Sequence, residues 1–230
     1  MRGLFVTGTD TGAGKTVLAA AICAGLVARG ERVAAFKPAV TGLDDEPGEW
    51  PPDHELLASV TGQTPSEVAP NRFGPPASPH LAAELAGGEL VPGDLLFAAH
   101  TAAEGADALV VEGVGGLRVP LTPGYSIRDL CSDLRLPLLV AARPGLGTIN
   151  HTLLTVEAAL AAGLEVAAVV LTPWPAHPGR VEQSNRATIE LATGLPVHQL
   201  PTTTLAGLAE AGTRLPLSQW LDSTRHTPAP

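Results

Sequence analysis

The stretch Gly8-Thr9-Asp10-Thr11-Gly12-Ala13-Gly14-Lys15-Thr16 decides the fold of this chain. A short apolar run precedes it, and an alanine-rich apolar run that favours a helix follows it. A glycine-rich loop between a strand and a helix binds phosphate, because backbone N–H groups and the positive end of the helix dipole converge on the anion. We therefore expect Lys15 to hold the β- and γ-phosphates of a nucleotide and the Thr16 hydroxyl to bind Mg²⁺. The expected nucleotide-binding residues of the loop are Gly12, Ala13, Gly14, Lys15, Thr16 and Val17.

This loop is longer than the usual phosphate-binding pattern. Five residues lie between Gly8 and Gly14, where the usual pattern has about four. The longer loop carries Thr11, whose hydroxyl can reach a terminal phosphate or a second substrate. The alternative is a chance Gly-Lys-Thr in a glycine-rich chain, and the strand before the loop and the helix after it argue against chance.

Composition and charge exclude several classes of protein. The 230 residues suffice for one large domain, so we expect a single domain over residues 1–230 with a frayed tail at 223–230. A formal net charge of −9 without a basic block argues against binding to nucleic acid or to an anionic membrane. No apolar run is long enough to span a bilayer and no secretory signal is apparent, so we expect a cytoplasmic protein. We expect Cys23 and Cys131 to be buried, and the histidines lack the spacing of a zinc site.

Apolar β-branched runs alternate with alanine-rich helical patterns along the chain. The strand-like runs are continuously apolar, which is typical of a parallel sheet buried on both faces. We therefore predict an α/β fold, a single-domain P-loop NTPase-like fold whose doubly wound, mostly parallel β-sheet is flanked by helices. The predicted strands are 4–7, 32–36, 108–112, 138–142, 166–171 and 197–200, and the predicted helices are 15–29, 53–61, 80–87, 92–104, 127–133, 149–162 and 180–193.

Two charged residues stand at the predicted ends of strands. A fixed cation at Lys37 can stabilise charge on a transferring phosphoryl group. The bland alternative is a surface lysine, and we expect Lys37 to be exposed enough that its removal leaves the fold intact. Glu112 ends the third strand, where an acid can complete the shell of a magnesium ion. Gly113, Gly115 and Gly116 let the following backbone pass close to a ligand. The nucleotide-binding residues expected here are Glu112, Gly113, Val114 and Gly115.

Two further segments have competing interpretations. Asp53 follows Pro51-Pro52 at the start of a helix, so it is equally an N-cap or a third magnesium ligand. The segment 145–151 opens another helix, whose free N–H groups suit a carboxylate. A plain strand-to-helix turn is the favoured interpretation there on physical grounds alone.

Taken together, the motifs resemble those of the dethiobiotin synthetase family, in matching order and spacing over residues 4–200. The motifs that carry the resemblance are Gly8-Thr-Asp-Thr-x-x-Gly-Lys-Thr16, Lys37-Pro-x-x-Thr-Gly42, Ser78-Pro-His80, Val111-Glu-Gly-x-Gly-Gly-Leu117 and Gly147-x-Ile-Asn-His151. The resemblance implies a homodimeric ligase of biotin synthesis that closes a ureido ring on 7,8-diaminopelargonate, using CO₂ or bicarbonate, ATP and Mg²⁺. An amine of the diamine would trap CO₂ as a carbamate, the carbamate would attack the γ-phosphate, and the neighbouring amine would open the resulting anhydride.

The resemblance also implies a role for each matching residue. By this resemblance, Lys15 would hold the β- and γ-phosphates. Mg²⁺ would be bound by Thr16, Asp53 and Glu112. Lys37 would stabilise both the carbamate and the phosphoryl group while it is being transferred. The resemblance gives the carbamate or γ-phosphate to Thr11, the diamine to Thr41, and the substrate carboxylate, across the dimer interface, to Gly147, Thr148 and Asn150. No protein nucleophile is needed, and positioning with concentrated positive charge is the expected machinery of phosphoryl transfer.

One segment departs from the family pattern. After the fifth strand the family usually has an asparagine that contacts the adenine edge, whereas this chain has Thr172-Pro173-Trp174. A single hydroxyl cannot make the paired contact of an amide, so we expect other nucleoside triphosphates to be accepted besides ATP. Trp174 is either a base-stacking residue or an exposed tryptophan. The second base-proximal segment comprises Pro201, Thr202 and Thr203, and it also differs from the common family sequence.

Two rival functions share the predicted fold. The first is a nucleotide-switch ATPase of the partitioning or septum-placement type, which carries an additional lysine early in the phosphate loop. This chain has no lysine before Lys15. Such ATPases also often have a C-terminal amphipathic helix that binds a membrane, and residues 205–224 lack the basic face of such a helix. The second is an amidotransferase-coupled synthase, which needs a glutaminase domain for which the chain leaves no room. The ligase is therefore the favoured function.

Overall fold

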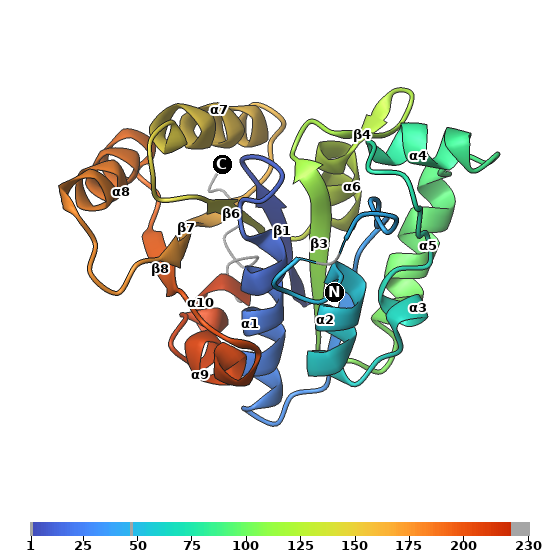
Figure 1. The fold of residues 1–230 in the computed structure, drawn as a ribbon, viewed down its shortest axis with the longest axis horizontal. Coiled ribbons are helices and arrows are strands. Elements are labelled where there is room, and N and C mark those ends of the chain that lie inside the picture. Colours follow the sequence, from blue (N-terminus) through green and yellow to red (C-terminus); the bar gives the residue numbers. More distant parts are fainter. Residues whose placement is uncertain (1, 47, 222–230) are drawn as a thin grey trace, which may run out of the picture.

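The computed structural model describes residues 2–46 and 48–221. Its centre is a six-stranded sheet with the order β2-β3-β1-β6-β7-β8, in which neighbouring strands are all parallel (Figure 1). The strands are β1 (Gly3–Gly8), β2 (Val33–Phe36), β3 (Ala108–Gly116), β6 (Leu138–Ala142), β7 (Val166–Trp174) and β8 (Val197–Pro201). The predicted parallel α/β fold is confirmed, and the expected tail at 223–230 lies outside the described residues.

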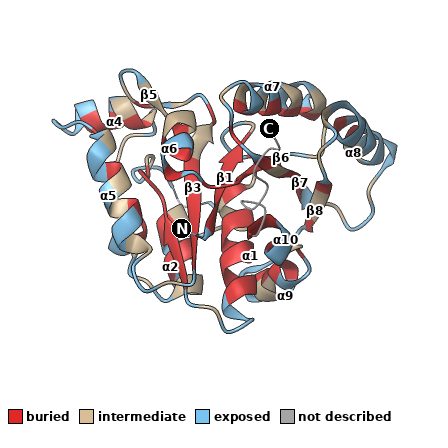
Figure 2. Ribbon diagram, turned by 180° about the vertical axis from the view of Figure 1, so that it is seen from behind, coloured by how far each residue is buried: buried red, intermediate tan, exposed pale blue. Residues whose placement is uncertain are grey.

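Helices cover both faces of the sheet, and the strands and α1 form the buried centre (Figures 1 and 2). Successive side chains of β1 point to opposite faces, so Leu4 joins one apolar cluster and Phe5 the other. The first face carries α1 (Lys15–Val27), α2 (Asp53–Thr61), α3 (Pro65–Val68), α9 (Leu208–Thr213) and α10 (Leu217–Leu221). The second face carries α4 (Pro79–Leu85), α5 (Pro92–Ala102), α6 (Ile127–Leu134), α7 (Thr148–Leu160) and α8 (Arg180–Thr193). All the predicted helices are present, with ends shifted by at most about two residues.

Several short elements escaped the prediction. They are α3, α9, α10, the 3₁₀ turn Leu205–Gly207 and a hairpin of β4 (Pro120–Thr122) and β5 (Tyr125–Ser126). Elements this short carry no detectable hydrophobic period. Helix α3 is instead stabilised by a capping box, in which Thr64 and Glu67 each accept a hydrogen bond from the other's backbone N–H.

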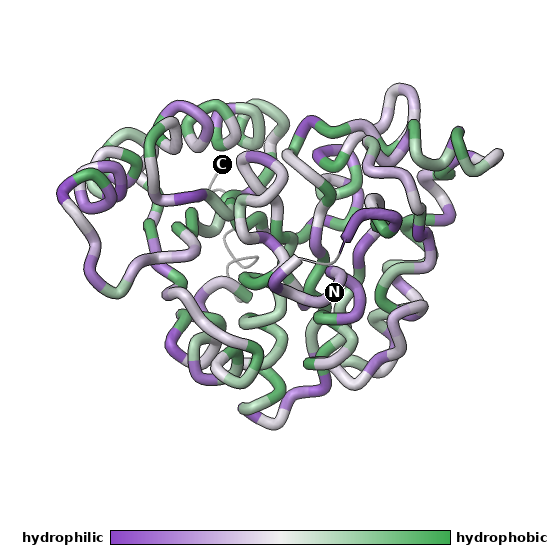
Figure 3. Tube along the Cα trace, viewed as in Figure 1, coloured by the Kyte–Doolittle hydropathy of each residue, from purple (hydrophilic) through white to green (hydrophobic). Residues whose placement is uncertain are grey.

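Helix α1 is buried on nearly all sides because it packs against the sheet and also against α2 and α9. Hydrophilic stretches concentrate instead on peripheral elements such as α8 (Figure 3). Helices α1 and α9 meet at Gly25 and Gly212, and a Cβ on Gly212 would lie only 1.8 Å from the Ala21 carbonyl oxygen. Only glycine permits this approach, which packs the helix of the phosphate loop tightly against α9.

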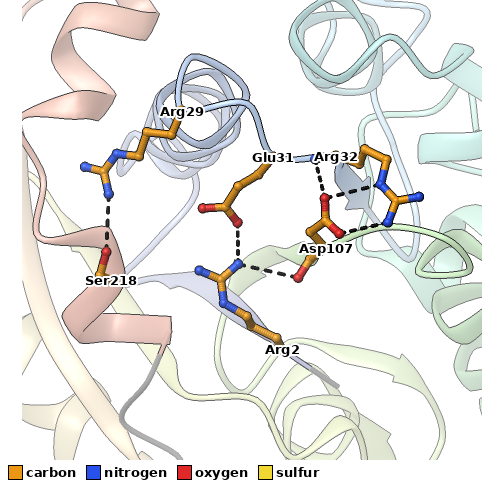
Figure 4. A network of polar contacts seen from close by, with 6 residues as sticks. All are labelled: Arg2, Arg29, Glu31, Arg32, Asp107 and Ser218. Atoms are coloured by element: carbon orange, nitrogen blue, oxygen red, sulfur yellow. Dashed lines mark hydrogen bonds and ion pairs between the residues drawn. The ribbon is translucent and has the colours of Figure 1, made fainter.

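A polar network links the amino-terminal ends of the first three strands of the sheet (Figure 4). Arg32 donates to both carboxylate oxygens of Asp107, over 2.8 and 3.2 Å, and its backbone N–H adds a 2.9 Å bond. Arg2 pairs with Glu31 and donates to the Asp107 carbonyl over 3.4 Å. These contacts stabilise the edge of the sheet opposite the phosphate loop.

Cys23 and Cys131 are free and buried, as predicted, and burial raises the pKa of the Cys131 thiol to about 12. Burial also raises the pKa of the Cys23 thiol, so both thiols are expected to stay protonated at neutral pH. Among residues 2–46 and 48–221, none of the helices has both the length and the apolar character that crossing a membrane demands.

Candidate active site

The phosphate loop runs from the end of β1 to the start of α1. Gly12 and Gly14 take left-handed backbone conformations, with φ of 71° and 84°. Gly14 is the N-cap of α1, and no side chain caps this helix, so its first N–H groups face the hollow of the loop. Lys15 donates to the Asp10 carbonyl over 3.0 Å. Burial and the nearby Lys37 lower the pKa of Lys15 to about 8.

Four side chains from four separate segments converge at the loop: Thr16 of α1, Lys37 after β2, Asp53 of α2 and Glu112 of β3. Lys37 donates to Glu112 Oε1 over 2.6 Å and pairs with Asp53 Oδ2 over 2.8 Å. The Thr16 hydroxyl lies 2.8 Å from both Asp53 Oδ1 and Glu112 Oε1. The structure therefore brings together the three predicted magnesium ligands and the predicted catalytic lysine. We call these four residues, Thr16, Lys37, Asp53 and Glu112, the cation cluster.

Strand register explains part of this convergence. Phe36 of β2 pairs with Val111 of β3, so the next residues along, Lys37 and Glu112, are neighbours. Glu112 was predicted to end its strand, but β3 continues to Gly116, and Glu112 is completely buried inside it. The carboxylate therefore depends on the cation cluster rather than on water for its partners.

Two expectations about the cation cluster are corrected. Lys37 was expected to be exposed, but only 2% of its surface is accessible. Burial alone lowers the pKa of Lys37, yet the charges of Asp53 and Glu112 outweigh it and the net shift is upward. Asp53 is not an N-cap, because Pro52 takes that position and the Asp53 side chain turns to Thr16 and Lys37 instead.

The cation cluster fits a magnesium ion chemically. Its donors are a hydroxyl and two carboxylates, the hard oxygen ligands that Mg²⁺ prefers. The Thr16 hydroxyl has one proton but faces two carboxylate oxygens, so hydrogen bonding cannot satisfy both contacts at once. Glu112 Oε2 is buried without a hydrogen-bond partner among the described residues. A cation among these oxygens would provide a partner both for the carboxylate oxygen that the Thr16 proton does not reach and for Glu112 Oε2.

A cavity of about 800 Å³ opens over the loop and the cation cluster. The predicted residues that line it are Thr11, Gly12, Gly14, Lys15, Thr16, Val17, Lys37, Thr41, Asp53, Glu112, Val114, Gly115, Thr172, Pro173, Pro201, Thr202 and Thr203. Ala13 and Gly113 do not line it. Ala13 is fully buried, and a Cβ on Gly113 would lie 2.9 Å from Ile127 Cγ2, so this glycine serves packing.

The segment that opens α7 lies apart from this cavity within the single chain. Gly147 is the N-cap of α7 and Asn150 is exposed, whereas the Thr148 side chain is buried against Thr152. The Thr148 N–H already donates to the Gly145 carbonyl over 3.3 Å. Of the three predicted residues, Gly147 and Asn150 are therefore exposed, whereas the Thr148 side chain is not.

The structure adds cavity residues that the sequence did not reveal. They are Gly42, Asp45, Glu49, Trp50, Pro76, Ala77, Ser78, Pro79 and Val119. The Ser78-Pro-His80 motif was the available signal, but the acidic, proline-rich segments around it show no period that could place them. Trp174 does not line the cavity; it is half-buried against the apolar core, so neither interpretation offered for it is right.

Comparison with known proteins gives a consistent result. Residues 2–201 match the family described as "AAA domain". The chain is 37% identical to an ATP-dependent dethiobiotin synthetase BioD of Anoxybacillus flavithermus, over 86% of this chain and 90% of the relative. It is 49% identical to the BioD of Anaeromyxobacter dehalogenans, over 74% of this chain and 76% of the relative.

The chain belongs to the dethiobiotin synthetase family. A BioD of Haloferax mediterranei is 36% identical over 97% of this chain and 95% of its own length, so the family likeness extends to nearly the whole sequence. The fold of this dethiobiotin synthetase family member also resembles "Structure of Cyanthece apo McdA", at a TM-score of 0.56 and 12% identity, covering 95% of this chain and 92% of that one. At that identity the likeness shows the fold alone.

Proposed function

We propose that this chain is an ATP- and Mg²⁺-dependent ligase that forms dethiobiotin from 7,8-diaminopelargonate and CO₂ in biotin synthesis. The observation that carries the proposal is the convergence of a phosphate loop with Thr16, Lys37, Asp53 and Glu112 on one cavity wall, in a member of the dethiobiotin synthetase family. A cavity of about 800 Å³ also falls within the usual size of small-molecule sites.

The residues divide the work by charge. Lys15 binds the β- and γ-phosphates at the start of α1. Lys37 neutralises the carbamate as it attacks and the phosphoryl group as it transfers. Bound Mg²⁺, held by Thr16, Asp53 and Glu112, supplies further neutralisation of phosphate charge. Thr11 contacts the carbamate or the γ-phosphate, and the second amine of the diamine then closes the ring and releases phosphate.

The diamine lies beside Thr41, within reach of the two lysines. A second copy of the chain contributes the start of its α7, with Gly147, Thr148 and Asn150, to bind the substrate carboxylate. The exposure of Asn150 away from its own cavity supports this arrangement, because a residue that serves a neighbouring subunit must face outward. The working enzyme is therefore a homodimer.

The nucleotide base lies against Thr172, Pro173 and the segment 201–203, which line the same cavity as the phosphate loop. This segment offers no paired amide donor and acceptor, which supports acceptance of bases other than adenine. ATP is a substrate, and CTP and GTP are used at comparable rates.

Incorporation of ¹³C-bicarbonate tests the function directly. With diaminopelargonate, Mg²⁺ and ATP, mass spectrometry of the reaction should find one labelled carbon in dethiobiotin. Lys37→Ala should form none, while retaining nucleotide binding through Lys15. Absence of labelled product from the unaltered chain, with ATP still hydrolysed, would favour the nucleotide-switch alternative.

A further inference from the structure

Lys37 holds the same carboxylates that would hold the metal. Its ammonium lies 2.6 Å from Glu112 Oε1 and 2.8 Å from Asp53 Oδ2. Among residues 2–46 and 48–221 it is the one basic side chain that forms an ion pair with either acid. The carboxylate charge that a magnesium site requires is thus already partly neutralised from within the protein.

Thr16 locates the position where the two cations conflict. Its hydroxyl lies 2.8 Å from both Asp53 Oδ1 and Glu112 Oε1, which belong to the two carboxylates that would hold a metal. Glu112 Oε1 also receives the Lys37 hydrogen bond, so a metal there would share one oxygen atom with an ammonium group. Two cations on one oxygen repel each other strongly in a buried environment, where solvent screens them little.

We propose that Lys37 competes with Mg²⁺ for Asp53 and Glu112, so that the free metal binds poorly and enters only together with a nucleoside triphosphate. This inference rests on the proposed metal site. Triphosphate adds negative charge beside the cation cluster, which both attracts the metal and gives the Lys37 ammonium an alternative partner in the cavity.

The surroundings of Lys37 allow this exchange. Lys37 lines the cavity, although its side chain is only 3% exposed, and its flexible stem can carry the ammonium from the carboxylates toward the phosphates. The Asp53 side chain is 41% exposed, so the ion pair between Lys37 and Asp53 can open without unpacking the core. Binding of the metal to the carboxylates is therefore coupled to movement of the Lys37 ammonium toward the reacting groups.

The composition of the chain offers a direct test, because Lys15 and Lys37 are its only lysines. Protein labelled with ¹⁵N and ¹³C at lysine should give two Nζ resonances, one from each lysine. Mg²⁺ alone should leave the Lys37 resonance in place, whereas Mg²⁺ with a non-hydrolysable ATP analogue should shift it. The Lys15 resonance reports nucleotide binding in the same sample. A Lys37 resonance that responds equally to Mg²⁺ alone would overturn the inference.

Mn²⁺ binding measured by electron paramagnetic resonance supplies the second test. Without nucleotide, Lys37→Met should bind Mn²⁺ at least about tenfold more tightly than the unaltered chain, because a neighbouring charge is removed. Lys15→Met is the matched control: it removes the same charge without breaking a contact to either carboxylate, and its gain should be smaller. Adding Glu112→Gln to Lys37→Met should cancel the gain.

The two tests separate the inference from the function it rests on. Equal Mn²⁺ affinities of the unaltered chain and Lys37→Met would overturn the competition alone. Failure of the unaltered chain to bind Mn²⁺ even with nucleotide would overturn the metal site and the inference together. If Lys37→Met does not fold, the lysine resonances of the unaltered chain decide the question.

Discussion

Thr172 packs directly against Gly14 of the phosphate loop. A Cβ built on Gly14 would lie 2.6 Å from Thr172 Cγ2, and Thr172 itself is only 1% exposed. The segment proposed to face the nucleotide base is therefore in contact with the loop proposed to face the phosphates. A change at Thr172 acts on both ends of one ligand.

Thr172→Asn tests the base choice. Asparagine supplies the paired donor and acceptor that threonine lacks, and a good paired contact discriminates between bases by about 1–3 kcal/mol. The substitution should raise the kcat/KM preference for ATP over CTP by roughly tenfold. Thr172→Val, which keeps the branched shape, should leave the preference unchanged. A preference for ATP already above roughly a hundredfold in the unaltered chain would contradict relaxed base choice.

Removal of Lys37 should destabilise the protein as well as inactivate it. Lys37→Met leaves the buried Glu112 carboxylate without its ammonium partner, and breaking a buried ion pair costs about 3–5 kcal/mol. Urea denaturation should show this loss in the free energy of unfolding. The double variant Lys37→Met/Glu112→Gln should recover part of the stability, because the unpaired charge is gone. An unchanged urea midpoint for Lys37→Met would contradict the observed burial.

Nucleotide binding should weaken above about pH 8. Burial, followed by the charge of Lys37, lowers the pKa of Lys15 to about 8, so the ammonium that we propose to bind phosphate loses its proton as the pH rises through that value. The KM for ATP should rise above this pH, while kcat changes less, because bound phosphate charge favours the protonated lysine. Lys15→Arg stays charged and should show a flat KM over the same range. A flat KM in the unaltered chain would remove Lys15 from phosphate binding.

The polar network around Arg32 and Asp107, at the amino-terminal ends of the strands, predicts an effect on stability at acid pH. Hydrogen bonds from Arg32 hold the pKa of Asp107 at about 2. A carboxylate with a lowered folded pKa stabilises the fold above its unfolded value, near pH ~4, and loses that contribution as the pH falls toward the folded value. Asp107→Asn should therefore flatten the decline in melting temperature between those two values. The same change at an exposed acid outside the network should not, and an identical decline in Asp107→Asn would exclude the network as its source.

The sequence predicted the strands, the main helices and the phosphate loop because these depend on local patterns, whereas cavity residues such as Thr41 and Thr202 came from the family resemblance. The glycine loop and the apolar runs are each legible over a few residues. The burial of Lys37 was missed because it depends on strand order: β3 lies between β1 and β2, which brings Glu112 beside Lys37. Asp45 and Trp50 were missed for a similar reason, since their place on the cavity wall is set by tertiary packing rather than by any period.

Phosphate release tests the proposed ligase most directly: it is measured from ATP, Mg²⁺ and bicarbonate with and without 7,8-diaminopelargonate, with CTP and GTP in parallel. Release should depend on the diamine and match dethiobiotin formation. Release that proceeds equally without the diamine would contradict the proposed function.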